Sequence, residues 1–137
     1  MIYFNYETDF EIADEEKLAN WIIATIIEEG CKEGEVNYIF CDDEYLHKLN
    51  VEFLDHDTLT DVISFDYCIG KEIHGDIYIS VERVRDNALD FKTKFEDEIH
   101  RVIIHGVLHY CGYKDKTDSD AELMRSKEDY YLAKLTK

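Results

Sequence analysis

Eleven consecutive residues in the last third of the chain carry the side chains best suited to hold a metal ion. They are His105-Gly106-Val107-Leu108-His109-Tyr110-Cys111-Gly112-Tyr113-Lys114-Asp115. On a helix, residues four apart share one face, about 5–6 Å from each other, so His105 and His109 can bind one ion. Gly112 can take the left-handed conformation that ends a helix, which lets the chain turn back and bring Asp115 to the same ion.

The number and type of these ligands indicate what the site does. Two imidazoles and a carboxylate leave coordination positions open for water, which is typical of a catalytic rather than a structural zinc site. Zinc acidifies a bound water and can polarise a phosphoryl oxygen. We therefore expect His105, His109 and Asp115 to hold one Zn²⁺ per chain and to act in hydrolysis through metal-bound water. The alternative, two core-facing histidines on an amphipathic helix, leaves Gly112 and Asp115 unexplained.

Gly106 argues against a peptidase. Zinc peptidases use HExxH, in which the glutamate is the general base. Gly106 occupies the position of that glutamate, and a glycine cannot deprotonate a water. An iron oxygenase with two histidines and one carboxylate is a more distant alternative, because nothing in the sequence indicates a site for a co-substrate.

Apolar periodicity predicts the elements that must position these residues. The predicted strands are Ile2–Glu7, Val36–Cys41, Asp61–Tyr67 and Asp76–Val81, the last two joined by a turn-like segment with Gly70 and Gly75. The predicted helices are Asp14–Glu29, Asp43–Phe53, Val81–Phe91, Phe95–Cys111 and Asp120–Leu135. Ser119 and Glu122 form a capping box for the last helix. Strands interspersed with helices predict an α+β fold: a single domain, residues 1–137, with a small mixed β-sheet packed with helices and a zincin-like metal-binding helix.

Length and composition fit this prediction, since 137 residues with 45% hydrophobic side chains can bury a core. The N-terminus lacks the basic and apolar regions of a signal peptide, and no stretch is long enough to span a membrane, which favours a cytoplasmic location. The four scattered cysteines are expected to be reduced and mostly buried.

The net charge of -17 is unusual for a nucleic-acid-binding protein, because phosphate contacts dominate the affinity of such proteins. We expect the acidic C-terminal segment to be a solvated helix face; its members are Asp118, Asp120, Glu122, Glu128 and Asp129. Around the metal motif, Arg101, Lys114 and Lys116 stand against Asp115 alone. This balance predicts a positive mouth of the site on a negative body.

Three motifs resemble those of the YbeY family, the metal-dependent, single-strand-specific endoribonucleases of bacterial rRNA maturation. Its hallmark HGxLHxxGYDH agrees with residues 105–115 at six positions. Leu49-Asn50 followed by Thr60-Asp61-Val62-Ile63-Ser64-Phe65 is similar to its LN…TDVLSF segment. The third motif is Gly75-Asp76-Ile77-Tyr78-Ile79-Ser80, followed by Asn87-Ala88. The similarity runs from about Val36 to the C-terminus.

The chain departs from the family pattern at two positions. The third metal ligand of the family is usually histidine, where this chain has Asp115, and the family arginine that follows the LN motif is replaced by Leu54. Leucine cannot neutralise phosphate, so either another cation substitutes or catalysis is weak. The candidate cations are Lys114, Lys116, Arg85 and His56.

The resemblance implies an endoribonuclease that cuts single-stranded rRNA, in 16S rRNA 3′-end maturation and ribosome quality control, with the ribosome or its proteins as partners. It places the strand at Val62–Phe65 beside the active-site cleft, with Thr60, Asp61 and Ser64 as cleft candidates; from its pattern alone this run is a core strand. Tyr113 could stack on an unpaired base, although packing is the commoner role. Two alternatives remain open: a ribosome-assembly factor that keeps the metal with little catalysis, and a zinc-dependent peptidase or amidase.

Overall fold

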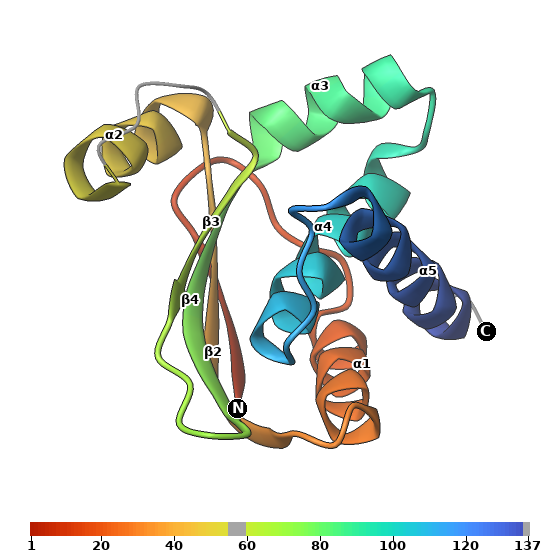
Figure 1. Ribbon diagram of the computed structural model, residues 1–137. Coiled ribbons are helices and arrows are strands. Elements are labelled where there is room, and N and C mark those ends of the chain that lie inside the picture. Colours follow the sequence, from red (N-terminus) through yellow and green to blue (C-terminus); the bar gives the residue numbers. More distant parts are fainter. Residues whose placement is uncertain (55–59, 136–137) are drawn as a thin grey trace.

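The computed structural model describes residues 1–54 and 60–135, with only the backbone of Leu54. Its strands are β1 (Ile2–Tyr6), β2 (Lys32–Cys41), β3 (Val62–Asp66) and β4 (Glu72–Ser80). Its helices are α1 (Glu15–Glu28), α2 (Asp43–Leu54), α3 (Val81–Phe91), α4 (Phe95–Tyr110) and α5 (Asp118–Leu135). Helices α1, α4 and α5 lie on one side of the sheet and α2 on the other, with α3 across one end (Figure 1).

The four strands form one mixed sheet in the order β1-β2-β4-β3. β1 runs parallel to β2 and β2 parallel to β4, whereas β3 pairs antiparallel with β4 at the edge. This confirms the predicted α+β class with a mixed sheet. The prediction of a core strand at Val62–Phe65 is wrong, because β3 is an edge strand in which only Ile63 is buried.

The core lies between the sheet and the three helices α1, α4 and α5. Alternate residues of the central strands point into it, as the two-residue period of a strand requires. They are Val36, Tyr38 and Phe40 of β2 with Ile73, Ile77 and Ile79 of β4, all fully buried. The helices contribute residues at helical spacing: Leu18, Ile22 and Ile26 of α1, and Ile99, Ile103 and Val107 of α4. The apolar face of α4 is thereby turned to the sheet.

Two glycines let α4 lie close against β4. A Cβ atom on Gly106 would come within 2.8 Å of Ile77 Cδ1, and one on Gly75 within 2.3 Å of the Tyr110 hydroxyl. That hydroxyl donates a hydrogen bond to the carbonyl of Phe65 at 2.9 Å. The prediction that Gly75 belongs to a turn is wrong: it lies inside β4, where the Tyr110 ring needs the space of a missing side chain.

The last helix begins with a different cap from the predicted one. Thr117 Oγ1 accepts a hydrogen bond from the backbone N–H of Asp120 at 3.1 Å, so Thr117, not Ser119, caps α5. Both hydroxyl residues have a carboxylate three positions later. Thr117 accepts the free backbone N–H of the first turn, and α5 therefore begins two residues before the predicted start.

Two further expectations concern the whole chain. Only Cys41 is buried and the other three cysteines are partly exposed, so the prediction of mostly buried thiols is wrong. In the described residues, no helix combines the length and the apolar character needed to cross a bilayer.

Candidate metal centre

The end of α4 and the loop that follows bring together His105, His109 and Asp115. The Nε2 atoms of His105 and His109 lie 3.3 Å and 3.5 Å from Asp115 Oδ2. One donor atom from each residue falls within 4.8 Å of the others. Gly112 has a φ of 111°, which turns the chain back past the helix end as its position in the sequence predicts.

Hydrogen bonds fix both imidazole rings. His105 Nδ1 lies 2.6 Å from Glu128 Oε2, and His109 Nδ1 lies 2.9 Å from the carbonyl oxygen of Tyr113. Both acceptors call for a proton on Nδ1, which leaves the Nε2 lone pairs directed toward Asp115. Metal-binding histidines are commonly held in this way. The donor set therefore fits a divalent metal ion.

Glu128 belongs to the candidate site, and the sequence analysis misplaced it. Its side chain is 7% exposed, and it binds His105 through one oxygen and Arg101 Nη1, at 2.7 Å, through the other. The prediction that Glu128 belongs to a solvated helix face is wrong, because this residue is buried. A signal was available, because Met124, Glu128 and Tyr131 share the buried stripe of α5, and a carboxylate on such a stripe requires a partner.

The protonation of His105 reflects these contacts. Burial alone would lower the pKa of its imidazole, but the hydrogen bond and charge of Glu128 outweigh burial and raise the pKa above the usual value, with Asp115 adding to the effect.

The loop that carries Asp115 is anchored from behind by Glu29. Tyr113 donates its hydroxyl proton to Glu29 Oε1 at 2.6 Å, and Tyr131 donates to the other carboxylate oxygen. Lys127 lies over the Tyr113 ring, 5.6 Å from its centroid. Tyr113 is therefore a packing residue whose carbonyl orients His109, and its ring is not presented for stacking on a base.

The three candidate metal ligands line a cleft of about 490 Å³. Thr60, Asp61 and Ser64 line it from the β3 side, where the resemblance placed them. It holds more carboxylates than cations: Asp61, Glu98, Asp115 and Glu128 against Arg101 and Arg125.

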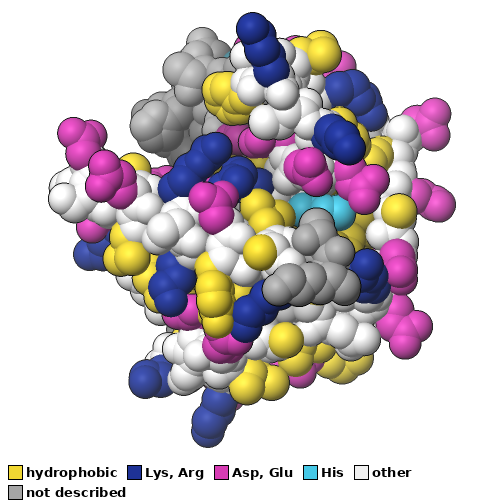
Figure 2. All heavy atoms as spheres, turned by 90° about the vertical axis from the view of Figure 1, so that its right-hand side faces the viewer, with side chains coloured by type: hydrophobic (Ala, Val, Ile, Leu, Met, Phe, Trp, Pro, Cys, Tyr) yellow, Lys and Arg dark blue, Asp and Glu magenta, His cyan; other side chains and the backbone are white. Residues whose placement is uncertain are grey.

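The prediction of a positively charged cleft entrance is wrong for the side chains that line it. The Arg101 guanidinium is engaged by Glu128 and by Asp129, at 2.6 Å from its Oδ1, and neither Lys114 nor Lys116 lines the cleft. On the side of the molecule seen in Figure 2, Lys and Arg side chains are interspersed with Asp and Glu and form no broad basic face.

The candidates for the missing family arginine can now be placed. The Arg85 guanidinium stacks on the Phe95 ring at 4.8 Å from its centroid and does not line the cleft. His56 and the Leu54 side chain lie outside the described residues. Arg125, which the sequence analysis did not consider, lies in the cleft wall.

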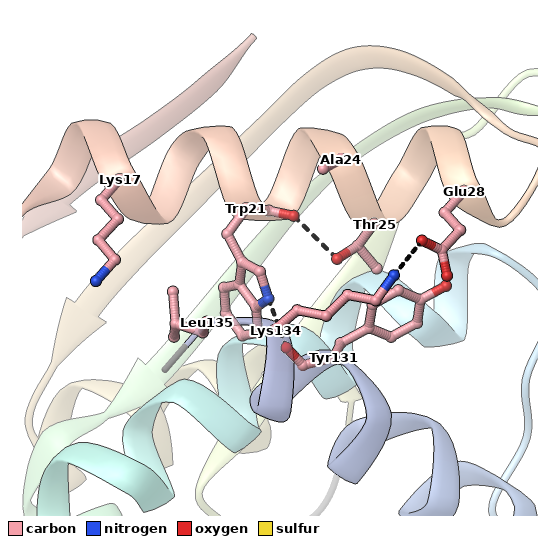
Figure 3. Close-up of a pocket in the computed structure, with 8 residues that line it drawn as sticks. All are labelled: Lys17, Trp21, Ala24, Thr25, Glu28, Tyr131, Lys134 and Leu135. Atoms are coloured by element: carbon pink, nitrogen blue, oxygen red, sulfur yellow. Dashed lines mark hydrogen bonds and ion pairs between the residues drawn. The ribbon is translucent and has the colours of Figure 1, made fainter. Parts of the chain in front are cut away.

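A separate hollow of about 280 Å³ lies between α1 and α5. Figure 3 shows the Trp21 indole N–H donating to the carbonyl of Tyr131, at 2.8 Å, and the Lys134 amino group beside Glu28. These contacts join the two helices. No group of metal-binding side chains is found there among the described residues, so the cleft remains the candidate site.

The fold and the cleft together define an α+β protein with a candidate metal centre on a helix and its following loop. Comparison with known proteins identifies the family. The chain matches the family described as Endoribonuclease YbeY over residues 3–136, and it belongs to that family.

Individual relatives agree over nearly the whole chain. The endoribonuclease YbeY of Flavobacterium johnsoniae is 65% identical over 133 residues, covering 97% of this chain and 96% of the relative. That of Flavobacterium psychrophilum is 67% identical over 132 residues, covering 96% and 94%. A solution structure of a Thermotoga maritima protein superposes with a TM-score of 0.71 at 27% identity, covering 98% of this chain and 89% of that one. The resemblance seen in the sequence motifs is confirmed.

Proposed function

We propose that the chain is a zinc-dependent endoribonuclease, a single catalytic domain over residues 1–137, with His105, His109 and Asp115 as the metal ligands. The observation that carries the proposal is the pair of Nε2 atoms facing Asp115 while each Nδ1 is held by an acceptor. A bound Zn²⁺ supplies Lewis acidity for phosphodiester hydrolysis and acidifies water. The high identity to relatives named endoribonuclease YbeY supports the reaction type.

The side chains of the cleft prepare the site for this reaction. Glu128 and the Tyr113 carbonyl hold the two imidazoles, so no reorientation is needed when the metal binds. Asp61 and Glu98 also face the cleft and can accept or donate protons at its wall. Gly106 packs on Ile77, so a side chain at the position of the peptidase glutamate would require Ile77 to shift.

The dimensions of the cleft favour an unpaired strand as substrate. A space of about 490 Å³ is the size of a small-molecule site. It accommodates a nucleotide or two of a flexible strand, whereas a rigid A-form duplex presents its phosphates on a broad convex surface.

The proposed substrate is rRNA, and the process is 16S rRNA 3′-end maturation and ribosome quality control in the cytoplasm. The net charge of -17 opposes tight binding of free RNA. We therefore infer that the ribosome or a ribosomal protein delivers the substrate to the site.

Metal content and cleavage of single-stranded RNA by the wild type, His109→Ala and Asp115→Ala test the proposal. We expect both variants to lose bound zinc and RNA cleavage, and Asp115→His to retain the metal because imidazole is also a zinc ligand. Asp118→Ala, at an exposed carboxylate outside the cleft, is the control and should resemble the wild type.

Full metal occupancy and activity in Asp115→Ala would remove this residue from the ligand set. A metal-saturated wild type that binds ribosomal particles but never cuts RNA would instead identify an assembly factor. Cleavage of casein without cleavage of RNA would identify a peptidase.

A further inference from the structure

Among the described residues, one basic side chain of the cleft forms no ion pair, although its charge acts on the nearby Glu98 carboxylate. Arg101 forms ion pairs with Glu128 and Asp129, and these two carboxylates already neutralise its charge. Arg125 lies on α5 three residues before Glu128, is exposed, and makes no ion pair with any of the described residues. It is the basic group of the cleft wall that is available to a ligand.

Arg125 also lines a second groove, of about 560 Å³, that adjoins the cleft. The two hollows share Glu98, Arg101 and Arg125 in their walls, so they adjoin at these three residues. The groove runs between α5 and the connection from α3 to α4, and Lys92 and Lys94 line it at that connection. Figure 1 shows this connection directly above α4, on the side where α5 packs.

The charges of the groove suit an anionic chain. Both lysines are exposed and, within residues 1–54 and 60–135, neither forms an ion pair. Two carboxylates of the groove present little negative charge to a ligand, because Asp129 is bound to Arg101 and Glu98 is almost completely buried. Asp97 remains exposed. In a chain with a net charge of -17, three cations that form no ion pair with the described residues, along two adjoining hollows, are a local exception.

We propose that this groove binds the phosphate backbone of the single-stranded RNA substrate, with Arg125 on a phosphate next to the metal centre and Lys92 and Lys94 on phosphates further along the strand. The proposal rests on the proposed function. Guanidinium groups bind phosphate through two parallel hydrogen bonds, whereas lysines act as mobile point charges. The arrangement thus fixes the strand at the cleft and guides it through the groove.

Binding of a fluorescein-labelled oligouridylate, measured by anisotropy in EDTA, tests the groove without cleavage. We expect Arg125→Ala to weaken binding about tenfold, and the double variant Lys92→Ala/Lys94→Ala to weaken it comparably, with no dependence on sequence. Each lost phosphate contact should also reduce the slope of log affinity against log salt by about 0.7. In metal-loaded protein, Arg125→Lys should recover part of the cleavage rate that Arg125→Ala loses.

The matched control is Lys32→Ala/Lys71→Ala, which removes the same charge from exposed positions outside the groove. The proposal is overturned if the groove variants bind the oligouridylate as tightly as this control. The same holds if these variants keep their RNA affinity and lose only the binding of a protein partner. A wild type that binds RNA through the groove but does not cut it contradicts the proposed function and leaves the groove standing, so the two failures are distinguishable.

Discussion

At the scale of single residues, the candidate metal centre depends on Glu128, the carboxylate that holds the His105 ring. The buried Glu128 connects the partly exposed Arg101 guanidinium to His105 through two hydrogen bonds. The arginine compensates the charge of the buried carboxylate, and the carboxylate holds the imidazole with its Nε2 atom toward Asp115. Without its cationic partner, a carboxylate this deeply buried would be costly.

We expect Glu128→Gln to weaken zinc binding by about 10–100-fold, the usual effect of losing a carboxylate behind a metal-binding histidine. An amide cannot supply the negative charge that both neighbours require. The affinity is measured by competition with a chromophoric chelator, and NMR of the imidazole nitrogens reports whether His105 still carries its proton on Nδ1. Asp129→Asn is the control, because Asp129 binds Arg101 but does not contact His105. Equal zinc affinities in the two variants would show that Glu128 only supports packing.

The sequence predicted that the three candidate ligands lie together and missed the residues that support them, for a physical reason. His105, His109 and Asp115 are related by helical spacing and one turn, which are local properties of the chain. Glu128 and Arg125 reach the cleft only because α5 packs back on α4, and no local pattern contains that docking. The charge of Glu128 was itself misleading, because a carboxylate among the other acidic residues of this segment resembles part of a solvated helix face.

At the scale of elements, the ends of the helices were predicted to within two residues, whereas β2 and β4 each begin four residues before the predicted start. The period of apolar residues located α4 within one residue at its C-terminus, because its buried stripe is continuous. The sheet order β1-β2-β4-β3 was not predictable, since it depends on which strands pair across long separations. The start of α5 was misplaced because Thr117 and Ser119 offer the same cap chemistry two residues apart.

These two hydroxyl residues allow a paired test of the α5 cap. Thr117→Ala should lower the free energy of unfolding by about 1 kcal/mol, since it removes the acceptor for the Asp120 N–H. Ser119→Ala should change it by less than about 0.5 kcal/mol, as an exposed position without that hydrogen bond. Urea denaturation followed by circular dichroism measures both. A larger loss at Ser119 would place the cap where the sequence suggested.

At the scale of the whole molecule, the charge of -17 sets the conditions under which the protein works. Thirty-two carboxylates against fifteen basic side chains repel one another in the compact state. Several of the cations that do occur are committed to internal ion pairs, as Arg83 is with Asp43 at 2.8 Å. Surface repulsion is therefore only partly relieved by pairing.

Salt should consequently stabilise the metal-free protein. Raising the ionic strength from about 0.01 M to about 0.1 M shortens the screening length from about 30 Å to about 10 Å, so we expect the melting temperature measured by calorimetry in EDTA to rise by several degrees. Sucrose, which does not screen charge, is compared at matched osmolality. An unchanged or lower melting temperature in salt would mean that ion pairs such as Arg83–Asp43 outweigh the repulsion.

The three candidate ligands lie within eleven residues of the chain, and this closeness affects more than the folded state. A short loop loses little entropy when its ends are brought together, so the denatured chain keeps much of the same chelating segment. Metal that binds the denatured ensemble as well as the native one adds less stability than its native affinity implies. The native fold adds the hydrogen bond by which Glu128 orients His105. The difference between the metal affinities of the native and the denatured protein measures what this orientation contributes.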